Sequence, residues 1–248
     1  MRTVSSRAAS LVLVAVLAAA VLMVTPATAS AGHDGAMTRP FAREVVRPGD
    51  RDRSTYAIEH VRELQLRLKR EQVLRGRTTG RYGQGTRAAV TRFQRRHGLR
   101  ATGVANGATW RRLLQRSNHN LRTARRRCAG AGWHACYDRR NHQLTLWRGG
   151  RLWNSWLVRG GSRRHKTRTG DFTVFRRDKD HVSSIFGSPM PYSQFFSGGQ
   201  ALHGSRNMMN PYRGHSHGCI NMYVEDARQL WALTHDRRLR VHVYGRWS

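Results

Sequence analysis

A single cysteine near the C-terminal end of the chain lies among histidines and glycines, in a pattern suited to covalent chemistry. Cys219 follows His217 by two residues and His203 by sixteen, and Gly204 and Gly218 adjoin these side chains. A thiol reacts as its thiolate, and a nearby imidazole is the commonest group that removes its proton. Gly218 lacks a Cβ, so the backbone there can turn sharply and direct N–H groups at a substrate carbonyl. The pattern predicts acyl transfer through a cysteine nucleophile.

Two histidines compete for the role of general base. His217 is nearer to Cys219 along the chain, whereas His203 comes from a separate segment, and the residues alone leave both open. His215 adds a third histidine to this region and raises the question of a metal. A metal would occupy the thiolate and block nucleophilic attack, so we expect neither a metal nor a cofactor.

The complete spacing resembles the active-site signature of the L,D-transpeptidase (YkuD-like) family, whose members remodel peptide crosslinks in bacterial cell walls. The residues that carry the resemblance are His203-Gly204 and Ser216-His217-Gly218-Cys219-Ile220-Asn221. The resemblance implies that His203 is the base and that the carbonyl of Gly204 fixes its tautomer. It further implies an oxyanion hole built from the backbone of His217, Gly218 and Cys219.

The reaction implied by this resemblance is peptidoglycan crosslinking. Cys219 would attack the carbonyl of the third residue of a stem peptide, release the terminal D-alanine and form a thioester. An amine from a neighbouring stem would resolve the thioester as a 3→3 crosslink, and water would give L,D-carboxypeptidase activity instead. A catalytically silent protein that only binds the cell wall is the alternative outside enzymology.

Substrate contacts are expected beside the nucleophile. The run from Asp180 to Tyr192 resembles the family segment that leads into the site, and we expect Met190 and Tyr192 to form a wall for the stem peptide. Ser216 is expected to orient His217, and Asn221 stands where the family uses Asn or Arg.

These residues must be positioned by a domain that is rich in strands, over residues 131–248. Hydrophobic residues alternate with polar ones in residues 143–147, a turn follows at residues 148–151, and residues 152–158 return as the partner strand. Further strands are expected at residues 172–175, 194–196, 200–203 and 240–244, with a hairpin turn at Gly198-Gly199. An amphipathic helix carrying Ala227, Leu230 and Trp231 follows the Cys219 loop. The expected fold is a mostly antiparallel, β-sandwich-like domain with one covering helix.

A small helical domain is expected before it, over residues 56–116. Hydrophobic residues recur at helical spacing from Ile58 to Leu68, around Phe93 and around Trp110, which predicts a three-helix bundle. The segment resembles peptidoglycan-binding domain 1, through Leu64-Gln65, Tyr82-Gly83, Thr86, Ala89-Val90, Phe93-Gln94, Gly98-Leu99, Gly103 and Thr109-Trp110. These are packing and turn positions, so a spacer that no longer binds glycan is the alternative.

The remaining segments predict export. Arg2 and Arg7 precede an apolar run of residues 11–24 and an Ala-x-Ala site at residues 27–29, as in a signal peptide of residues 1–29. We expect a secreted, wall-associated monomer with no membrane span after cleavage. Residues 30–55 are expected to be an exposed linker or tether, and residues 117–130 a basic interdomain linker.

Charge and cysteine content narrow the partners. The formal net charge is +31, which favours anionic wall polymers besides peptidoglycan stem peptides and glycan. The arginines near residue 125 carry no interleaved aromatic residues, so we expect no specific nucleic acid. In an oxidising compartment, a Cys128–Cys136 disulfide would leave Cys219 as the free thiol.

Overall fold

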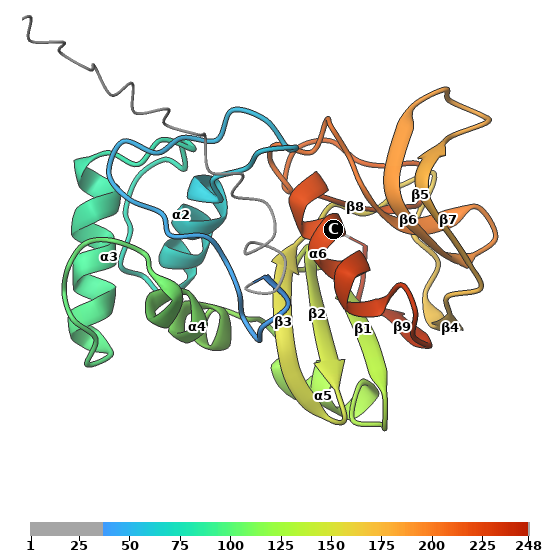
Figure 1. Cartoon of the computed structure of the whole chain (residues 1–248), viewed down its shortest axis with the longest axis horizontal. Coiled ribbons are helices and arrows are strands. Elements are labelled where there is room, and N and C mark those ends of the chain that lie inside the picture. Colours follow the sequence, from blue (N-terminus) through green and yellow to red (C-terminus); the bar gives the residue numbers. More distant parts are fainter. Residues whose placement is uncertain (1–36, 248) are drawn as a thin grey trace, which may run out of the picture.

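The computed structural model describes residues 37–247, so the predicted signal peptide (1–29) and the first part of the expected linker (30–36) lie outside the described residues. The described residues form five helices and two mixed sheets, with the helices α2 to α4 beside the strands (Figure 1). No helix in this part of the chain is long and apolar enough to cross a membrane.

Three helices share one core in the N-terminal half. They are α2 (Val61–Arg70), α3 (Gln84–Arg96) and α4 (Gly107–Arg116). Leu64, Phe93 and Trp110 are fully buried in this core, as the helical spacing predicts. Asn106 caps α4, because its side chain accepts a hydrogen bond from the backbone N–H of Thr109.

A fourth helix lies where a basic linker was expected. α5 (Leu121–Arg127) has Ala124 buried beside the sheet, while the arginines that follow remain exposed. The segment expected as a linker thus contains a short helix that was not predicted. One small buried residue and a half-buried leucine give too weak a periodicity to mark a helix. A disulfide joins Cys128, at the end of this helix, to Cys136.

Two mixed sheets make up the C-terminal half. A five-stranded sheet has the order β3-β2-β1-β9-β4, and a four-stranded sheet has the order β5-β6-β7-β8. Each contains one parallel pair, β1 with β9 and β7 with β8, and the other pairs are antiparallel. The strand bounds are β1 (Trp133–Asp138), β2 (Gln143–Arg148), β3 (Arg151–Leu157), β4 (Gly170–Thr173), β5 (Arg176–Val182), β6 (Pro189–Ser197), β7 (Gln200–Gly204), β8 (Ile220–Met222) and β9 (Leu239–Tyr244).

The predicted hairpins are present, but three strands were not predicted. β2 and β3 join through the turn at residues 148–151, and β6 and β7 through Gly198-Gly199. β1 is buried at every position and therefore shows no alternation, β5 consists almost entirely of charged residues, and β8 has three residues. Alternation of hydrophobic and polar residues detects only strands with one buried face.

The main hydrophobic core lies between the sheets and the helix α6 (Val224–Thr234), which follows β8 directly. Trp156 and Val241 contribute from the five-stranded sheet, Leu202 and Ile220 from the four-stranded sheet. α6 packs against β6, β7 and β8, so it supports the strands on either side of the Cys219 loop.

The segment expected as an exposed linker is packed against both halves over residues 37–55. Val46 is fully buried, and Arg43 is buried in an ion pair with Glu63 of α2, with Nε to Oε2 at 3.0 Å. Glu63 also binds Arg67 at 2.7 Å, and Arg43 donates to the carbonyl of Ser155 on β3 at 2.8 Å. Mixed charge suggested solvent exposure, but here the charges neutralise one another in the interior. The segment therefore joins the helical half to the strand-rich half.

A buried histidine makes a second link between the halves. The His60 ring lies between Glu44, at 2.5 Å, and Asp226 of α6, at 3.0 Å. Burial disfavours the charged ring, but the two carboxylates outweigh it and raise the pKa of His60 well above its ordinary value. The ring is therefore an imidazolium at neutral pH. It connects the start of α2 to the helix behind the Cys219 loop.

Candidate active site

The parallel pairing of β7 with β8 brings His203 and Cys219 together. Leu202 pairs with Ile220 and His203 with Asn221 in this register. Continuing the register by one residue sets Cys219 beside Ala201, two residues before His203. Side chains two residues apart on a strand share a face, so the imidazole and the thiol project from the same side of the sheet.

Both side chains line one cavity of about 280 Å³. Of the residues expected at the site, Met190, His203, Ser216, His217, Cys219 and Asn221 line it. His215, Arg159, Phe186, Ser188, Pro189, Ser205, Arg206 and Asn207 complete the lining. The loop between β7 and β8 supplies one side, and the start of β6 supplies another.

The His203 ring is held in one tautomer. Its Nδ1 donates to the carbonyl of Gly204 at 2.7 Å, which leaves the lone pair on Nε2. The side chain is buried, and this burial lowers the pKa of His203 to about 4. At neutral pH the ring is therefore uncharged and able to accept a proton.

The Cys219 thiol is the free thiol of the described residues and is partly buried. Burial raises the pKa of Cys219, and a backbone hydrogen bond from Ala201 opposes this only in part. Its Sγ lies 3.7 Å from the carbonyl oxygen of Gly199, as expected for a thiol that donates weakly. Before substrate arrives, the pair is thus a thiol and a neutral imidazole rather than a thiolate and an imidazolium.

Gly218 has a backbone conformation that favours glycine, and a side chain lies close to it. Its φ is +120°, and a Cβ there would lie 2.4 Å from Nε2 of the Gln200 side chain. The Gly218 N–H donates to the hydroxyl of Ser216 at 3.0 Å, and that hydroxyl donates to the carbonyl of Cys219 at 2.6 Å. Ser216 therefore holds the loop around Cys219 and does not orient His217. The Gly218 amide, expected in the oxyanion hole, is already engaged.

The other two histidines lie at the rim of the cavity and are exposed. The His217 ring stacks on Phe186, with centroids 4.4 Å apart, and the His215 ring faces Trp247 at 5.5 Å. Neither belongs to a cluster of metal ligands within the described part of the chain.

Tyr192 does not line the cavity, unlike Met190. Its φ of 59° interrupts the regular alternation of β6, and its ring faces Trp231 of α6 with centroids 6.2 Å apart. The expectation that both residues wall the substrate assumed an undistorted strand. The structure places only Met190 beside Cys219.

Sequence reasoning missed Arg159, a buried cation in the cavity. Its Nη1 donates to the carbonyls of Asn207 and Arg213 at 3.3 and 3.1 Å, and its Nε has no partner. None of the described carboxylates forms an ion pair with it, and burial lowers its pKa. Arg159 follows the predicted strand of residues 152–158, and only its backbone bridge to Asn221 brings it to the site.

Comparisons with known proteins identify a family for each half of the chain. Residues 132–243 match the family model of the L,D-transpeptidase catalytic domain, and residues 59–113 match that of a peptidoglycan binding domain. No curated protein matches the chain by sequence.

Two solved structures are similar to this chain over most of its length. An L,D-transpeptidase from Stackebrandtia nassauensis is 24% identical, with a TM-score of 0.51 over 84% of this chain and 98% of that one. An L,D-transpeptidase from Xylanimonas cellulosilytica is 24% identical, with a TM-score of 0.47 over 82% of this chain and 98% of that one. The first likeness shows a shared fold. The chain thus combines a domain of the peptidoglycan-binding family with a domain of the L,D-transpeptidase catalytic family.

Proposed function

We propose that the protein is a cell-wall transpeptidase that forms 3→3 crosslinks through a thioester on Cys219. The observation that carries the proposal is the shared cavity of His203 and Cys219, in which the histidine tautomer leaves Nε2 as the proton acceptor. Both family matches support peptidoglycan as the substrate. Secretion to the wall, as the sequence of residues 1–29 predicts, would bring the enzyme to it.

The reaction proceeds in two transfers. As Cys219 Sγ attacks the carbonyl of the third stem residue, the thiol proton passes to His203 Nε2. The tetrahedral oxyanion is stabilised by the N–H groups of His217 and Cys219, because the Gly218 N–H is engaged by Ser216. The imidazolium then gives its proton to the departing D-alanine amine. An amine of a second stem resolves the thioester, and water in its place gives the shortened peptide.

Arg159 is proposed to bind a carboxylate of the substrate. It is a buried guanidinium without an acidic partner among the described residues, in the cavity that holds the nucleophile. The terminal carboxylate of the leaving D-alanine has the charge that fits. Arg159→Gln should raise KM for a tetrapeptide donor at least about tenfold, with little change in alkylation of Cys219 by uncharged iodoacetamide. Equal KM values in the variant and the wild type would contradict this role.

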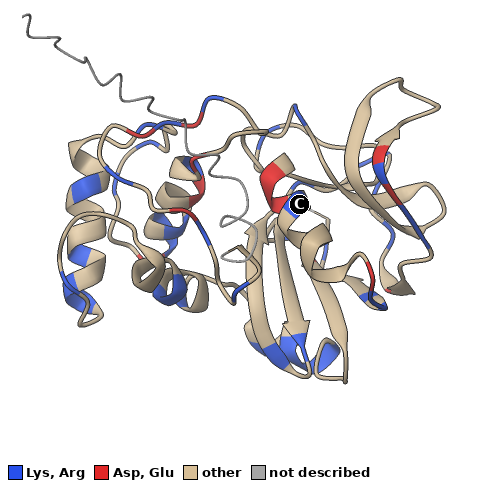
Figure 2. Cartoon of the chain, in the orientation of Figure 1, with Lys and Arg blue, Asp and Glu red and all other residues tan. Residues whose placement is uncertain are grey.

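A basic cavity beside the helical half is a candidate binding surface for the cell wall. A cavity of about 530 Å³ lies between residues 39–43 and α4, and Arg39, Arg111 and Arg112 line it. Figure 2 shows Lys and Arg over both halves of the molecule, with several acidic residues beside α2 and at the start of α6. We propose that this surface holds anionic wall polymer. Affinity for isolated wall should then fall as salt is raised, and an unchanged affinity would refute it.

The nucleophile is tested by intact mass after incubation with a carbapenem. Wild type should gain one covalent adduct, and Cys219→Ala should gain none. Cys136→Ser, which leaves Cys219 in place, serves as the control and should retain the adduct. An adduct on Cys219→Ala would place the nucleophile elsewhere. No adduct on folded wild type would favour the binding protein without catalysis.

A further inference from the structure

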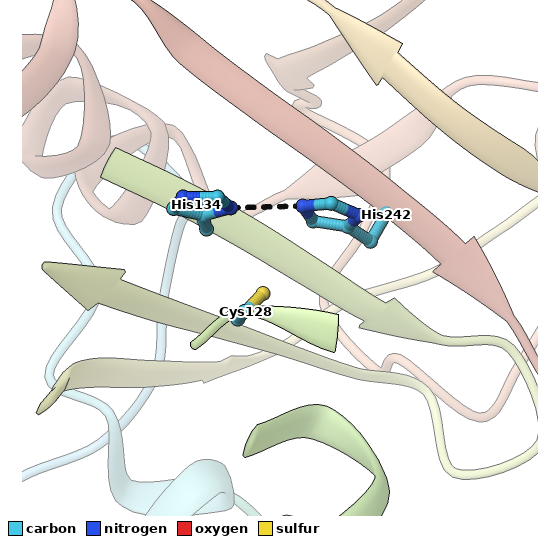
Figure 3. A group of neighbouring side chains, drawn as sticks. All are labelled: Cys128, His134 and His242. Carbon is cyan, nitrogen blue, oxygen red and sulfur yellow. Dashed lines mark hydrogen bonds between the residues drawn. The ribbon is translucent and has the colours of Figure 1, made fainter. Parts of the chain in front are cut away.

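A second group of reactive side chains lies on the outer face of the five-stranded sheet, beneath α5. His134 of β1, His242 of β9 and Cys128 are all buried, and their potential ligand atoms lie within 4.8 Å of one another. Their neighbours Ala135 and Val241 face the main core, so the histidines project from the opposite side. Figure 3 shows the two rings edge to edge, with the Cys128 side chain directed toward them.

The two histidines share a hydrogen bond at their central contact. Nδ1 of His242 lies 2.7 Å from a carboxylate oxygen of Asp171, and Nε2 of His134 lies 3.0 Å from the carbonyl of Ala131. Both oxygens accept hydrogen bonds, so each outer nitrogen carries an N–H. The inner nitrogens, His134 Nδ1 and His242 Nε2, lie 2.9 Å apart, with one proton between them. A metal ion bound by both inner nitrogens would take the place of that proton.

The surroundings resemble the second layer of a metal site. Each ring has an acceptor at its outer nitrogen, Asp171 for His242 and Ala131 for His134, which leaves the inner nitrogens to bind a metal once their shared proton is lost. The turn after Cys128 holds His134 tightly, because a Cβ on Gly130 would lie 3.1 Å from its ring. Two nitrogens bound at about 2.0–2.1 Å to a tetrahedral Zn²⁺ would be roughly 3.3 Å apart. The rings would therefore need to move apart by a few tenths of an ångström and also to turn, because their inner nitrogens now point at each other, with ring planes 9° apart and centroids 5.2 Å apart.

The disulfide determines whether sulfur is available as a ligand. Cys128 is bonded to Cys136, and a disulfide sulfur is a poor metal ligand compared with a thiolate. Two cations flank the group. Arg127 Nη1 lies 3.9 Å from a carboxylate oxygen of Asp171, and Arg240 is the backbone partner of His134 in the β1–β9 register. A dication there needs the negative charge of a thiolate. The oxidised form therefore disfavours the ion that the two rings could otherwise bind.

We propose that reduction of the Cys128–Cys136 disulfide creates a binding site for a divalent transition metal of the zinc class, with Cys128, His134 and His242 as ligands. A dithiol supplies two electrons and two protons, the S–S bond breaks into two thiols, and the dithiol becomes a disulfide. As the metal binds, Cys128 loses its proton, and the proton between the two imidazole rings is released as well. The fourth position is open to Cys136 or water. This site is separate from the Cys219 cavity and is independent of the proposed function.

A matched pair of variants tests the site with Co²⁺ as a spectroscopic probe. In a Cys219→Ala background, Cys136→Ser leaves Cys128 as the chain's single thiol, and Cys128→Ser leaves Cys136 instead. The Cys136→Ser protein should bind one equivalent of Co²⁺ with a thiolate charge-transfer band. The Cys128→Ser protein should bind at least about tenfold more weakly and without the band. Adding His242→Gln to Cys136→Ser should abolish binding, whereas adding His235→Gln, at the exposed end of α6, should not.

Metal protection in the otherwise unaltered chain makes the test independent of how the variants fold. After reduction and removal of the reductant, Zn²⁺ should slow maleimide labelling of Cys128 at least about tenfold, as measured by peptide mass, and should leave Cys219 labelling unchanged. The disulfide-bonded protein should bind no Zn²⁺. Labelling of Cys128 at the same rate with and without Zn²⁺, or equal Co²⁺ binding by the two serine variants, would overturn the proposal.

Discussion

Burial gives Cys219 and His203 opposite pKa shifts that keep both groups uncharged. Burial raises the pKa of the thiol, and it lowers the pKa of the imidazole to about 4. Proton transfer is therefore coupled to attack on the substrate, since no ion pair exists beforehand. Such a thiol is protected from indiscriminate electrophiles until a substrate carbonyl is in place.

This protonation state predicts the pH profile of alkylation. Only the thiolate reacts with iodoacetamide, and its fraction rises about tenfold per pH unit below the thiol pKa. Because that pKa is raised, the rate at Cys219 should climb from pH 6 to pH 8 without a plateau, as followed by intact mass. A preformed thiolate–imidazolium pair would instead react at a nearly constant rate over this range, and that result would contradict the account.

Gly218 makes a separate prediction. Gly218→Ala introduces a Cβ at a φ of +120°, which strains the backbone beside Cys219, and 2.4 Å from the side-chain amide of Gln200, which must move. A displacement of about 1 Å can reduce turnover about 100-fold, which carbapenem acylation rates would measure. Gly199→Ala is the control, because a Cβ there meets nothing within 4 Å and its φ is not positive. Equal losses in both variants would show that the effect is not specific to the Gly218 turn.

Sequence reasoning identified the reactive residues better than their supports. His203, Cys219 and Met190 line the cavity. They could be identified because they belong to the sequence signature or precede it closely. Arg159 and the metal-ligand group were missed because their partners come from distant strands. His242 reaches His134 only through the parallel β1–β9 pairing, across 108 positions of sequence. Tyr192 was misplaced because a positive φ in a strand has no periodic signal.

At the scale of elements, α2 carries a charge cluster that its helical periodicity does not reveal. Glu63 is fully buried between Arg43 and Arg67, and these cations, outweighing the effect of burial, lower the pKa of Glu63 to about 2. Hydrophobic spacing located α2, α3 and α4, since each buries one apolar face. It could not locate the partners of a buried carboxylate, because ion pairs over long sequence separations follow no period.

Removing that carboxylate charge should destabilise the fold. Glu63→Gln leaves two buried guanidinium groups without a counterion, and breaking such a pair costs about 3–5 kcal/mol. Urea unfolding should report the loss. Glu225→Gln provides the comparison, since Glu225 pairs with Arg228 on a partly exposed part of α6 and should contribute no more than about 1 kcal/mol. Similar losses in the two variants would contradict the role assigned to the buried cluster.

At the scale of the whole molecule, His60 couples the two halves to pH. Its pKa is raised in the folded protein, so its stabilising effect is complete below the unfolded value of about 6.5. The effect is lost as pH rises toward the folded pKa, because the unfolded ring releases its proton first. The free energy of unfolding should fall by up to about 1.4 kcal/mol per pH unit in that window.

His60→Gln removes the titrating group and should flatten this part of the profile, as measured by urea unfolding from pH 6 to pH 9. His235→Gln, near the C-terminal end of α6, is the control and should keep the wild-type slope. A His60→Gln protein with an unchanged slope would show that other groups determine the pH dependence of the interface.

The central claim concerns the bond that Cys219 forms, and the products from disaccharide-tetrapeptide test it most directly. Mass analysis after incubation with the full chain should reveal a dimer that has lost one D-alanine, and Cys219→Ala should give none. Shortened monomer alone would identify water as the acceptor. Dimer formed equally by Cys219→Ala, or unchanged substrate with folded wild type, would contradict the account.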